Sequence, residues 1–330
     1  MKLEKKYIIA VIFSSIAMFA VGYYFGGRIV NNFGQLQNGK QNAMRLRGFK
    51  YSNPLLECDI FNSDMTSKGL LTRMKNEVEK RFSDKKLVTA SMYFRDLNNG
   101  PWVGVDEKEM FTPASLMKVP MMMAFYKNLE GNPKLLSKKI TYHDVKVMPQ
   151  DIEDGYVFED GKEYTIRELM EIMIMNSSNR AAELLLENID ASTIQKVFHD
   201  LNIPDPVNGS VEDYMNVSDY SSFFRILYNA SYLTKENSEN ALALLTKTKF
   251  REGLIAGLPS DVEVAHKFGE RKYLKDGKEL KQLHDCGIIY ANNRNYILCV
   301  MTRGNDWPEL KSAIGDVSRI VYTNFVLDNK

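Results

Sequence analysis

The alternation of apolar and polar residues divides the stretch after residue 69 into a helix and a pair of strands. Residues 70–82 carry apolar side chains at helical spacing, which predicts one buried helix face. Residues 88–94 then alternate between apolar and polar, which is the period of a strand. Asn99 and Gly100 are typical of a tight hairpin turn, so residues 102–105 are the expected returning strand.

Helical spacing then dominates up to about residue 250. Residues 121–126 are apolar on every side, as expected of a helix buried in a core. Thr165 and Glu168 form a capping box, which predicts a helix over residues 166–175. Ser218 is the expected N-cap of a later helix.

The strand period returns near the end of the chain. Strands are predicted over residues 262–268, 285–290 and 296–302, and a last helix is predicted from about Pro308. This order predicts a mixed α+β fold, in which an antiparallel five-stranded sheet is flanked by helices. An all-helical lobe over about residues 119–255 is expected to be inserted into it.

The N-terminal stretch has the features of a membrane anchor. Residues 1–6 are basic, and residues 7–25 contain no charge. At about 1.5 Å per residue, such a helix is long enough to cross a hydrocarbon core of roughly 30 Å. The lysines before it favour an orientation with the rest of the chain outside the cytoplasm. A cleaved signal peptide is the alternative, and the length of the apolar run favours the uncleaved anchor.

The chain is thus expected to have three parts. They are a cytoplasmic tail and signal anchor over residues 1–27, a linker over 28–68 and a folded domain over 69–330. The folded domain would lie on the periplasmic or cell-surface side, and it would be secreted if the first segment were cleaved.

Composition narrows the function classes. The 330 residues carry a net charge of +1 and no long basic run, which argues against a nucleic-acid partner. The four histidines and three cysteines lack metal-ligand spacing, so no metal is predicted. No glycine-rich phosphate loop occurs, so no nucleotide and no other cofactor is expected. Composition does not predict the oligomeric state.

Two of the cysteines lie on predicted neighbouring strands. Cys286 and Cys299 flank a hairpin that turns at Asn292 and Asn293, and in that register they are opposite one another. An oxidising compartment would permit a bond. Directly opposed cysteines form strained bridges, so two free buried thiols are the expected state. Cys58 is assigned no role.

A serine and a lysine three residues apart are the first candidate for chemistry. Ser115 and Lys118 lie where a strand pattern gives way to a helical one, and residues i and i+3 share a helix face. A serine hydroxyl needs a base before it can act as a nucleophile, and a lysine with a lowered pKa is such a base. Alone, this S-x-x-K pattern is weak evidence.

Two more motifs follow in order. Ser177-Ser178-Asn179 lies between two predicted helices, and Lys267-Phe268-Gly269 ends a predicted strand. With these motifs, the chain resembles the penicillin-recognising serine hydrolases, especially class A β-lactamases and the related D,D-peptidases. Their signature is S-x-x-K, S-D-N and K-T-G in that order. The resemblance covers roughly residues 70–328 and implies a serine hydrolase that forms an acyl-enzyme.

Carried over position by position, the resemblance implies catalytic roles. Ser115 would be the acylated nucleophile, and Lys118 would help to take its proton. Ser177 would relay a proton toward the leaving nitrogen, and Asn179 would bind the substrate's side-chain amide. Lys267 would hold positive charge in the cleft, which favours a neutral Lys118 and attracts a substrate carboxylate.

On the substrate side, the resemblance implies that the oxyanion would rest on the backbone N–H groups of Ser115 and Glu270, just past Gly269. The chain also departs from the family pattern at Phe268 and Ser178. Phe268 replaces the family threonine that contacts the substrate carboxylate, and its ring is expected to turn toward the cleft and favour an apolar substituent. Ser178 replaces the family aspartate, which predicts an altered turn rather than lost chemistry.

A class A β-lactamase also needs a glutamate that activates the deacylating water. Glu212 and Asn216 have E-x-x-x-N spacing, close to the family's E-x-x-L-N. Glu212 is therefore the candidate deacylation base, and Asn216 is a candidate substrate-binding residue. The alternative is an acidic surface turn before a helix cap.

The leading hypothesis is a membrane-anchored class A β-lactamase-like enzyme that hydrolyses β-lactam amides through an acyl-enzyme at Ser115. The first alternative is a D,D-carboxypeptidase or penicillin-binding protein acting on D-Ala-D-Ala peptides of peptidoglycan. The second alternative is a sensor that binds β-lactams or wall fragments without hydrolysing them. The sequence leaves the substrate spectrum open.

Overall fold

The computed structural model describes residue 45 and residues 48–54, 65–152, 155–204, 212–291 and 294–328. The predicted membrane anchor, most of the predicted linker and Cys58 lie outside these residues. No helix within the described ranges is long and apolar enough to cross a membrane.

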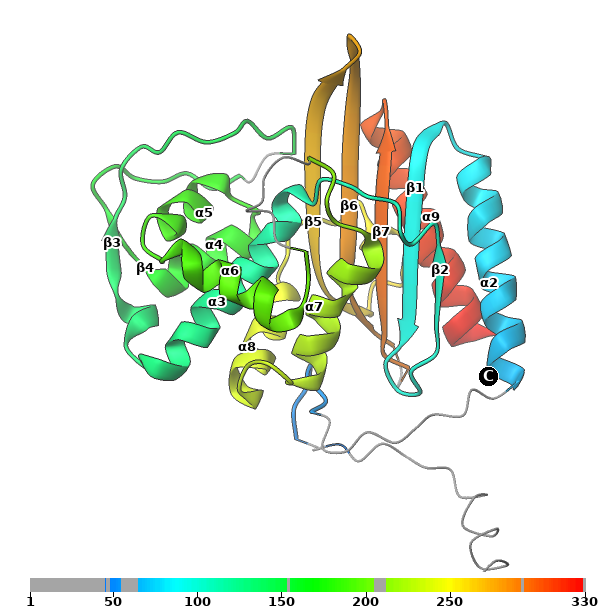
Figure 1. Ribbon diagram of the computed structural model, residues 1–330, viewed down its shortest axis with the longest axis horizontal. Coiled ribbons are helices and arrows are strands. Elements are labelled where there is room, and N and C mark those ends of the chain that lie inside the picture. Colours follow the sequence, from blue (N-terminus) through cyan, green and yellow to red (C-terminus); the bar gives the residue numbers. More distant parts are fainter. Residues whose placement is uncertain are drawn as a thin grey trace, which may run out of the picture. The chain divides into compact units, whose positions relative to one another are not determined.

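One antiparallel sheet of five strands forms the centre of the fold, in the order β2-β1-β7-β6-β5 (Figure 1). The strands are β1 (Leu87–Asp96), β2 (Trp102–Val105), β5 (Glu263–Lys275), β6 (Lys278–Tyr290) and β7 (Tyr296–Gly304). The predicted five-stranded α+β fold is confirmed. Strand β5 is an edge of this sheet, so alternate backbone groups along it are available to other partners.

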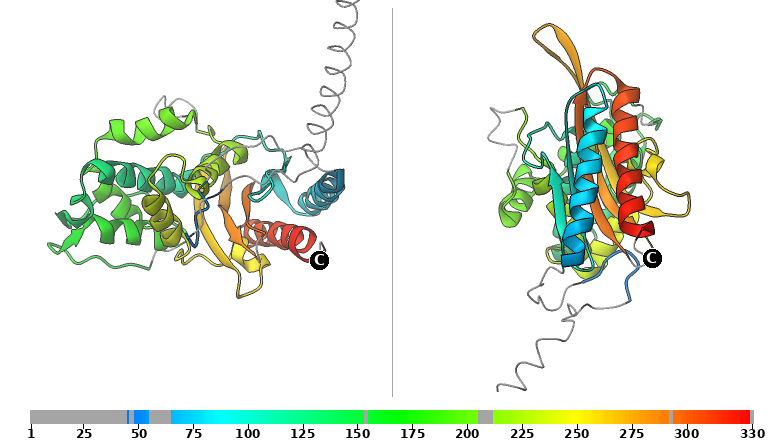
Figure 2. Two further views of the ribbon diagram at one scale, coloured as in Figure 1. Left: turned by 90° about the horizontal axis from the view of Figure 1, so that it is seen from below. Right: turned by 90° about the vertical axis from the view of Figure 1, so that its right-hand side faces the viewer.

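Helices cover both faces of the sheet. On one face, α2 (Met65–Ser83) and α9 (Trp307–Tyr322) lie side by side (Figure 2). The helical lobe lies on the other side (Figure 1). Its helices are α3 (Lys118–Gly131), α4 (Ile166–Met175), α5 (Asn179–Leu186), α6 (Ala191–Leu201), α7 (Val217–Asn229) and α8 (Lys235–Leu245), with a small sheet of β3 (Lys139–Thr141) and β4 (Glu163–Thr165).

Alternation along the strands sorts apolar side chains into two cores. On β1, Tyr93 belongs to the core shared with the helical lobe, whereas Met92 and Phe94 belong to the core under α2 and α9. The strand period read from the sequence therefore explains why both faces of the sheet are covered.

Several element boundaries differ from the prediction. The capping box of Thr165 and Glu168 is present at the start of α4. The cap of α7 is Asn216, not Ser218, because the Asn216 side chain accepts the Asp219 N–H at 2.8 Å. Strands β5 and β6 extend well beyond the predicted ranges as a polar two-stranded hairpin, which has no apolar alternation to reveal it.

Part of the predicted linker belongs to the folded domain. The Glu239 carboxylate on α8 accepts hydrogen bonds from the backbone N–H groups of Tyr51 and Ser52 and from the Ser52 hydroxyl. Ser52 is buried. These contacts come from residues far apart in the chain, so no local pattern predicts them.

Cys286 and Cys299 are opposite one another in the β6–β7 register, as predicted. The expectation of two free thiols is wrong, because the structure joins them in a disulfide. Their Cα atoms are only 3.9 Å apart, so the direct cross-strand pairing brings the two sulfur atoms within bonding reach.

Strand β5 passes unusually close to the turn that carries Ser115. A Cβ atom on Gly269 would lie 2.6 Å from the Pro113 carbonyl oxygen and 3.0 Å from the Leu116 nitrogen. Only glycine leaves room for this approach. Gly269, expected as a substrate-side residue, therefore has a structural reason of its own to be glycine.

We predict that Gly269→Ala lowers the free energy of unfolding by about 1–3 kcal/mol, the usual cost of overpacking. The matched control is Gly69→Ala on α2, where an added Cβ meets nothing within 4 Å. That control should gain up to about 1 kcal/mol, because alanine is the better helix former. Urea unfolding of both variants measures the contrast, and equal effects would contradict it.

Candidate active site

The serine and lysine of the first motif are in contact. A short 3-10 helix, η1 (Ala114–Met117), carries Ser115, and α3 begins at Lys118. The Lys118 Nζ donates to the Ser115 Oγ at 3.0 Å. Ala114 has a φ of +50°, an unusual value for a non-glycine residue, so the turn that presents Ser115 is strained.

The second motif completes the surroundings of Lys118. Its Nζ also donates to the Ser177 carbonyl oxygen and, at 2.8 Å, to the Asn179 Oδ1. Ser177 has a φ of +58°, in the left-handed region, and joins α4 to α5. Ser178 caps α5 by accepting the Ala181 N–H at 3.4 Å. The serine that replaces the family aspartate therefore serves the turn.

Lys267 brings a second lysine amine to the same place. It is fully buried on β5, and its Nζ donates to the Ser177 Oγ at 2.7 Å and to the Phe268 carbonyl at 2.8 Å. The Lys118 Nζ is 3.4 Å from the same Ser177 Oγ. Burial, and then the charge of Lys118, lower the pKa of Lys267 well below its usual value.

Phe268 does not present the apolar surface to a substrate that its place in the motif predicts. Its ring is 3% exposed and stacks on Phe250 with ring centres 4.2 Å apart. The Lys267 Nζ lies 4.3 Å from the centre of the same ring. Because the ring fills the core under α9, it supports the buried lysine from behind rather than facing the cleft.

Glu270 follows on the edge strand β5. Its backbone N–H as an oxyanion donor stays a prediction. Its side chain has a use that the sequence did not indicate, because the carboxylate accepts the backbone N–H groups of Asp151 and Ile152 at 2.8 and 2.9 Å. Burial in this position raises the pKa of Glu270.

Glu212 and Asn216 do not join the cluster as predicted. The Glu212 side chain is 72% exposed and forms an ion pair with Arg271 at 3.0 Å. Asn216 uses its amide to cap α7, accepting from the Asp219 N–H and donating to the Asp219 carboxylate. The acidic turn before a helix cap, the alternative reading of this segment, describes both residues.

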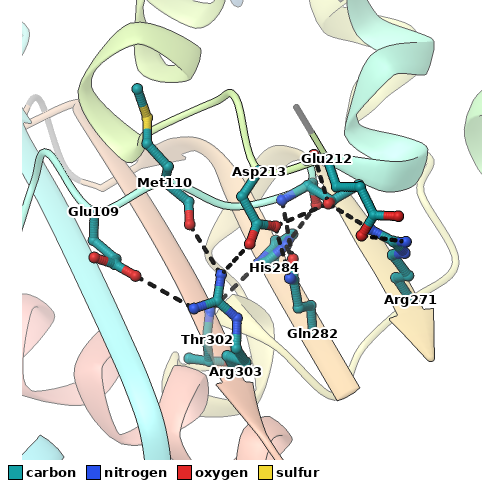
Figure 3. A network of polar contacts seen from close by, with 10 residues as sticks. Glu109, Met110, Glu212, Asp213, Arg271, Gln282, His284, Thr302 and Arg303 are labelled. Atoms are coloured by element: carbon teal, nitrogen blue, oxygen red, sulfur yellow. Dashed lines mark hydrogen bonds and ion pairs between the residues drawn. The ribbon is translucent and has the colours of Figure 1, made fainter. Parts of the chain in front are cut away.

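A polar network holds the chain just before Ser115 (Figure 3). The Asp213 carboxylate accepts from Arg303 at 2.9 Å, from the Thr112 hydroxyl at 2.9 Å and from Gln282 at 3.1 Å. Burial raises the pKa of Asp213, but the hydrogen bonds from Gln282 and Thr112 and the charge of Arg303 outweigh it and lower the pKa overall. Arg271 also donates to the Thr112 hydroxyl at 2.7 Å.

His284 is part of the same support. Its Nε2 lies 3.0 Å from the Thr112 carbonyl oxygen, and its Nδ1 lies 3.3 Å from the Thr302 nitrogen. Burial, reinforced by the charge of Arg303, lowers the pKa of His284 to about 4. The ring is therefore neutral at pH 7, and these partners assign a proton to Nε2 and an acceptor role to Nδ1.

His266 and Asp285 form a separate buried pair. The His266 Nδ1 is 2.8 Å from the Asp285 Oδ1, and the Asp285 Oδ2 accepts the Leu254 N–H at 2.9 Å. Both side chains are fully buried. Their complete burial beside Lys267 is typical of a structural role.

Sequence reasoning missed Gln150, Asp213, Gln282 and Arg303. Asp213 occupies an unspecified position of the E-x-x-x-N segment, the other three belong to no motif, and each comes from a different part of the chain. Gln150 donates to the Ser177 carbonyl at 3.1 Å and accepts the Asn179 N–H at 3.2 Å. Within the described ranges, no group of three metal-ligating side chains gathers as a metal site would require.

One comparison with known proteins identifies a family. A family model described as the beta-lactamase enzyme family matches residues 73–325. A comparison with curated proteins finds no match.

Solved structures share the fold. The structure of PBP-A has a TM-score of 0.65 and 24% identity, covering 77% of this chain and 96% of that one. The TLA-1 extended-spectrum β-lactamase has a TM-score of 0.67 and 16% identity, covering 78% and 99%. A class A β-lactamase from Mycobacterium abscessus has a TM-score of 0.66 and 19% identity, covering 76% and 99%.

We predict that His284 makes folding stability depend on pH. Its pKa is 6.5 when unfolded and about 4 when folded, so between these values the unfolded chain binds the extra proton. The free energy of unfolding should therefore fall by about 3 kcal/mol as the pH drops from 6.5 to 4. Urea unfolding at both pH values should show this loss in the wild type and a smaller one in His284→Gln. Identical losses would contradict the assignment.

We also predict that Lys267→Met separates stability from activity. The substitution removes a cation whose burial is costly, so the protein should become more stable by about 1–2 kcal/mol at pH 7 while acylation is lost. Thermal unfolding and labelling by a penicillin measure the two effects. Lys108→Met, at an exposed lysine, should change neither. Loss of stability in Lys267→Met would mean that its hydrogen bonds outweigh the cost of burial.

Proposed function

The chain belongs to the beta-lactamase enzyme family, and from this premise we propose that it is a penicillin-binding acyl-serine enzyme that acts on peptides ending in D-Ala-D-Ala. β-Lactams would acylate the same serine and leave it slowly. The observation that carries this choice is the position of Glu212, whose carboxylate is exposed and paired with Arg271.

The acylation step uses the contact between Lys118 and Ser115. In its deprotonated form, the Lys118 amine would take the Ser115 hydroxyl proton across 3.0 Å while the oxygen attacks the substrate carbonyl. The carbon–nitrogen bond of the substrate then breaks, and the acyl group stays on Ser115 as an ester. The departing nitrogen needs one proton, and the Ser177 hydroxyl supplies it and is reprotonated from Lys118.

The proximity of the two lysines favours these proton transfers. Two ammonium groups around the Ser177 hydroxyl repel one another, so the pair holds its second proton less readily than two isolated lysines would. Lys267 is buried on a rigid strand, and when the one proton left on the pair resides there, its charge would also attract a carboxylate at the end of a peptide substrate.

Removal of the acyl group is where β-lactamases and penicillin-binding proteins differ. Rapid hydrolysis needs a base that activates a water beside the ester. The Glu212 carboxylate is already held by a guanidinium at the surface, and the Asn216 amide is already used in a helix cap. Both facts support slow deacylation of β-lactams and argue against the leading sequence hypothesis of a fast β-lactamase.

We also propose that the domain acts outside the cytoplasm, anchored by the N-terminal segment. The uncharged run over residues 7–25 supports this in the sequence. The disulfide of Cys286 and Cys299 fits an oxidising compartment.

We predict that a fluorescent penicillin labels the wild type and that the adduct persists for many minutes. Ser115→Ala should give no adduct, because the hydroxyl that forms the ester is gone. Ser137→Ala, at an exposed serine at the end of a 3-10 turn, is the control and should label normally. The assay is in-gel fluorescence, combined with release of D-alanine from an N-acylated D-Ala-D-Ala peptide.

Glu212→Gln decides between the two enzyme classes. We expect it to leave the decay of the adduct unchanged, because Glu212 contacts Arg271 instead of the ester. Fast penicillin hydrolysis in the wild type that disappears in Glu212→Gln would establish a β-lactamase instead. If no penicillin adduct forms and neither penicillin nor the D-Ala-D-Ala peptide is hydrolysed, only the non-hydrolytic sensor remains.

A further inference from the structure

Residues 148–152, called here the strap, connect the helical lobe to the sheet. They belong to the long connection between β3 and β4, which runs from the lobe toward β5 (Figure 1). This segment has no helix or strand of its own, so its position depends on the side chains that hold it.

On the lobe side, the strap holds the turn of Ser177 and Asn179. The Gln150 amide donates to the Ser177 carbonyl at 3.1 Å and accepts the Asn179 N–H at 3.2 Å. The Asn179 amide donates to the Met148 carbonyl at 3.0 Å. Ser177 has a strained, left-handed backbone, so these bonds help to keep it in that conformation.

On the sheet side, a different set of contacts holds the strap. The Glu270 carboxylate accepts the N–H groups of Asp151 and Ile152 at 2.8 and 2.9 Å. The Asp151 carboxylate pairs with Lys272 at 2.9 Å and accepts from the Trp307 indole at 3.1 Å. Glu270 and Lys272 both come from β5, directly after the buried Lys267.

The two sets of contacts lie on opposite sides of the acyl-serine cluster. Ser177 and Asn179 bound it on the lobe side, and β5 bounds it on the sheet side, where Gly269 packs against the turn of Ser115. The strap is bonded to the Ser177 turn and to β5 at once, so it connects the two sides. A substrate lying along the edge of β5 would meet the strap at Glu270.

We propose that Gln150 is a positioning residue for Ser177 and Asn179, and that Glu270 controls substrate entry by latching the strap to β5 beside the acyl-serine cluster. This inference rests on the proposed acyl-serine function. Substrate enters when Asp151 and Ile152 leave Glu270, whereas Gln150 stays on the lobe. The strap then swings from its lobe-side attachment.

The exposure and bonding of the two sets of contacts explain why the strap leaves the sheet and stays on the lobe. The sheet-side ion pair is partly open to water, with side-chain exposures of 28% for Asp151 and 43% for Lys272, so water can replace it at little cost. The Glu270 carboxyl is half-buried, and burial disfavours its charged form. On the lobe side, Gln150 binds two backbone groups of the catalytic turn, and breaking these bonds would disturb Ser177 itself.

The test measures acylation rates by intact-protein mass spectrometry with benzylpenicillin and with 6-aminopenicillanic acid, which lacks the acyl side chain. Glu270→Ala keeps the backbone N–H and removes the latch, and Asp151→Ala removes the other two contacts. Each should speed acylation at least tenfold, and by the same factor for both compounds. A gate multiplies every rate equally, whereas a side chain that touches the substrate would not.

Asp144→Ala is the matched control, an exposed aspartate in the same connection, and its rates should equal those of the wild type. Gln150→Ala should instead slow acylation of both compounds, because Ser177 and Asn179 lose their support. Gln150→Glu should recover only part of the wild-type acylation rate, since a carboxylate can accept the Asn179 N–H but cannot donate to the Ser177 carbonyl oxygen. Unchanged or unequal factors in Glu270→Ala overturn the gate.

Amide hydrogen exchange tests the latch without any substrate. The N–H groups of Asp151 and Ile152 should exchange slowly in the wild type and at least tenfold faster in Glu270→Ala. Unchanged exchange overturns the latch. If no variant and no wild-type protein is acylated, the proposed function fails, and exchange alone still decides whether Glu270 holds the strap.

Discussion

Two lysines converge on the hydroxyl of Ser177, and the rest of the site is arranged so that this contact survives. Lys267 reaches it from β5 at 2.7 Å, and Lys118 reaches it from the start of α3 at 3.4 Å. Two buried amines lose hydration, and they repel one another when both are charged, so the fold must hold them there by packing and hydrogen bonds. The Phe268 ring and the Ser177 carbonyl do this for Lys267 and Lys118, respectively.

The need to hold the two lysines together explains why contacts from distant parts of the chain fix the backbone around the site. Gly269 lets β5 approach the turn of Ser115, and the neutral His284 and the charged Asp213 hold Thr112 just ahead of it. Gln150 holds the Ser177 turn from the strap. Each contact fixes one segment of backbone, so the distances between the catalytic atoms depend on the packing of the sheet against the lobe rather than on any single helix.

The sequence predicts those parts of this arrangement that rest on local patterns. The strand period and the capping box of Thr165 locate the elements, and the spacing of Ser115 and Lys118 puts them on one face. Contacts between distant segments leave no such pattern. The Phe268 ring turns to the core because Phe250, 18 positions earlier, offers a stacking partner. Asn216 caps α7 because its side chain reaches the Asp219 N–H, although Ser218 has equal capping propensity.

The proposed acylation and deacylation steps therefore depend on residues in different segments of the chain. The groups that open the substrate amide lie on elements that the motifs mark, and burial on β5 and α3 holds them close together. The deacylating carboxylate that the resemblance implies, Glu212, lies in the segment before α7, where Arg271 on β5 forms an ion pair with it. That pairing is electrostatic and local: the Arg271 guanidinium holds Glu212 and the Thr112 hydroxyl together. This arrangement keeps Ser115 in place and the Glu212 carboxylate at the surface, which supports the proposal of a protein that holds its acyl group.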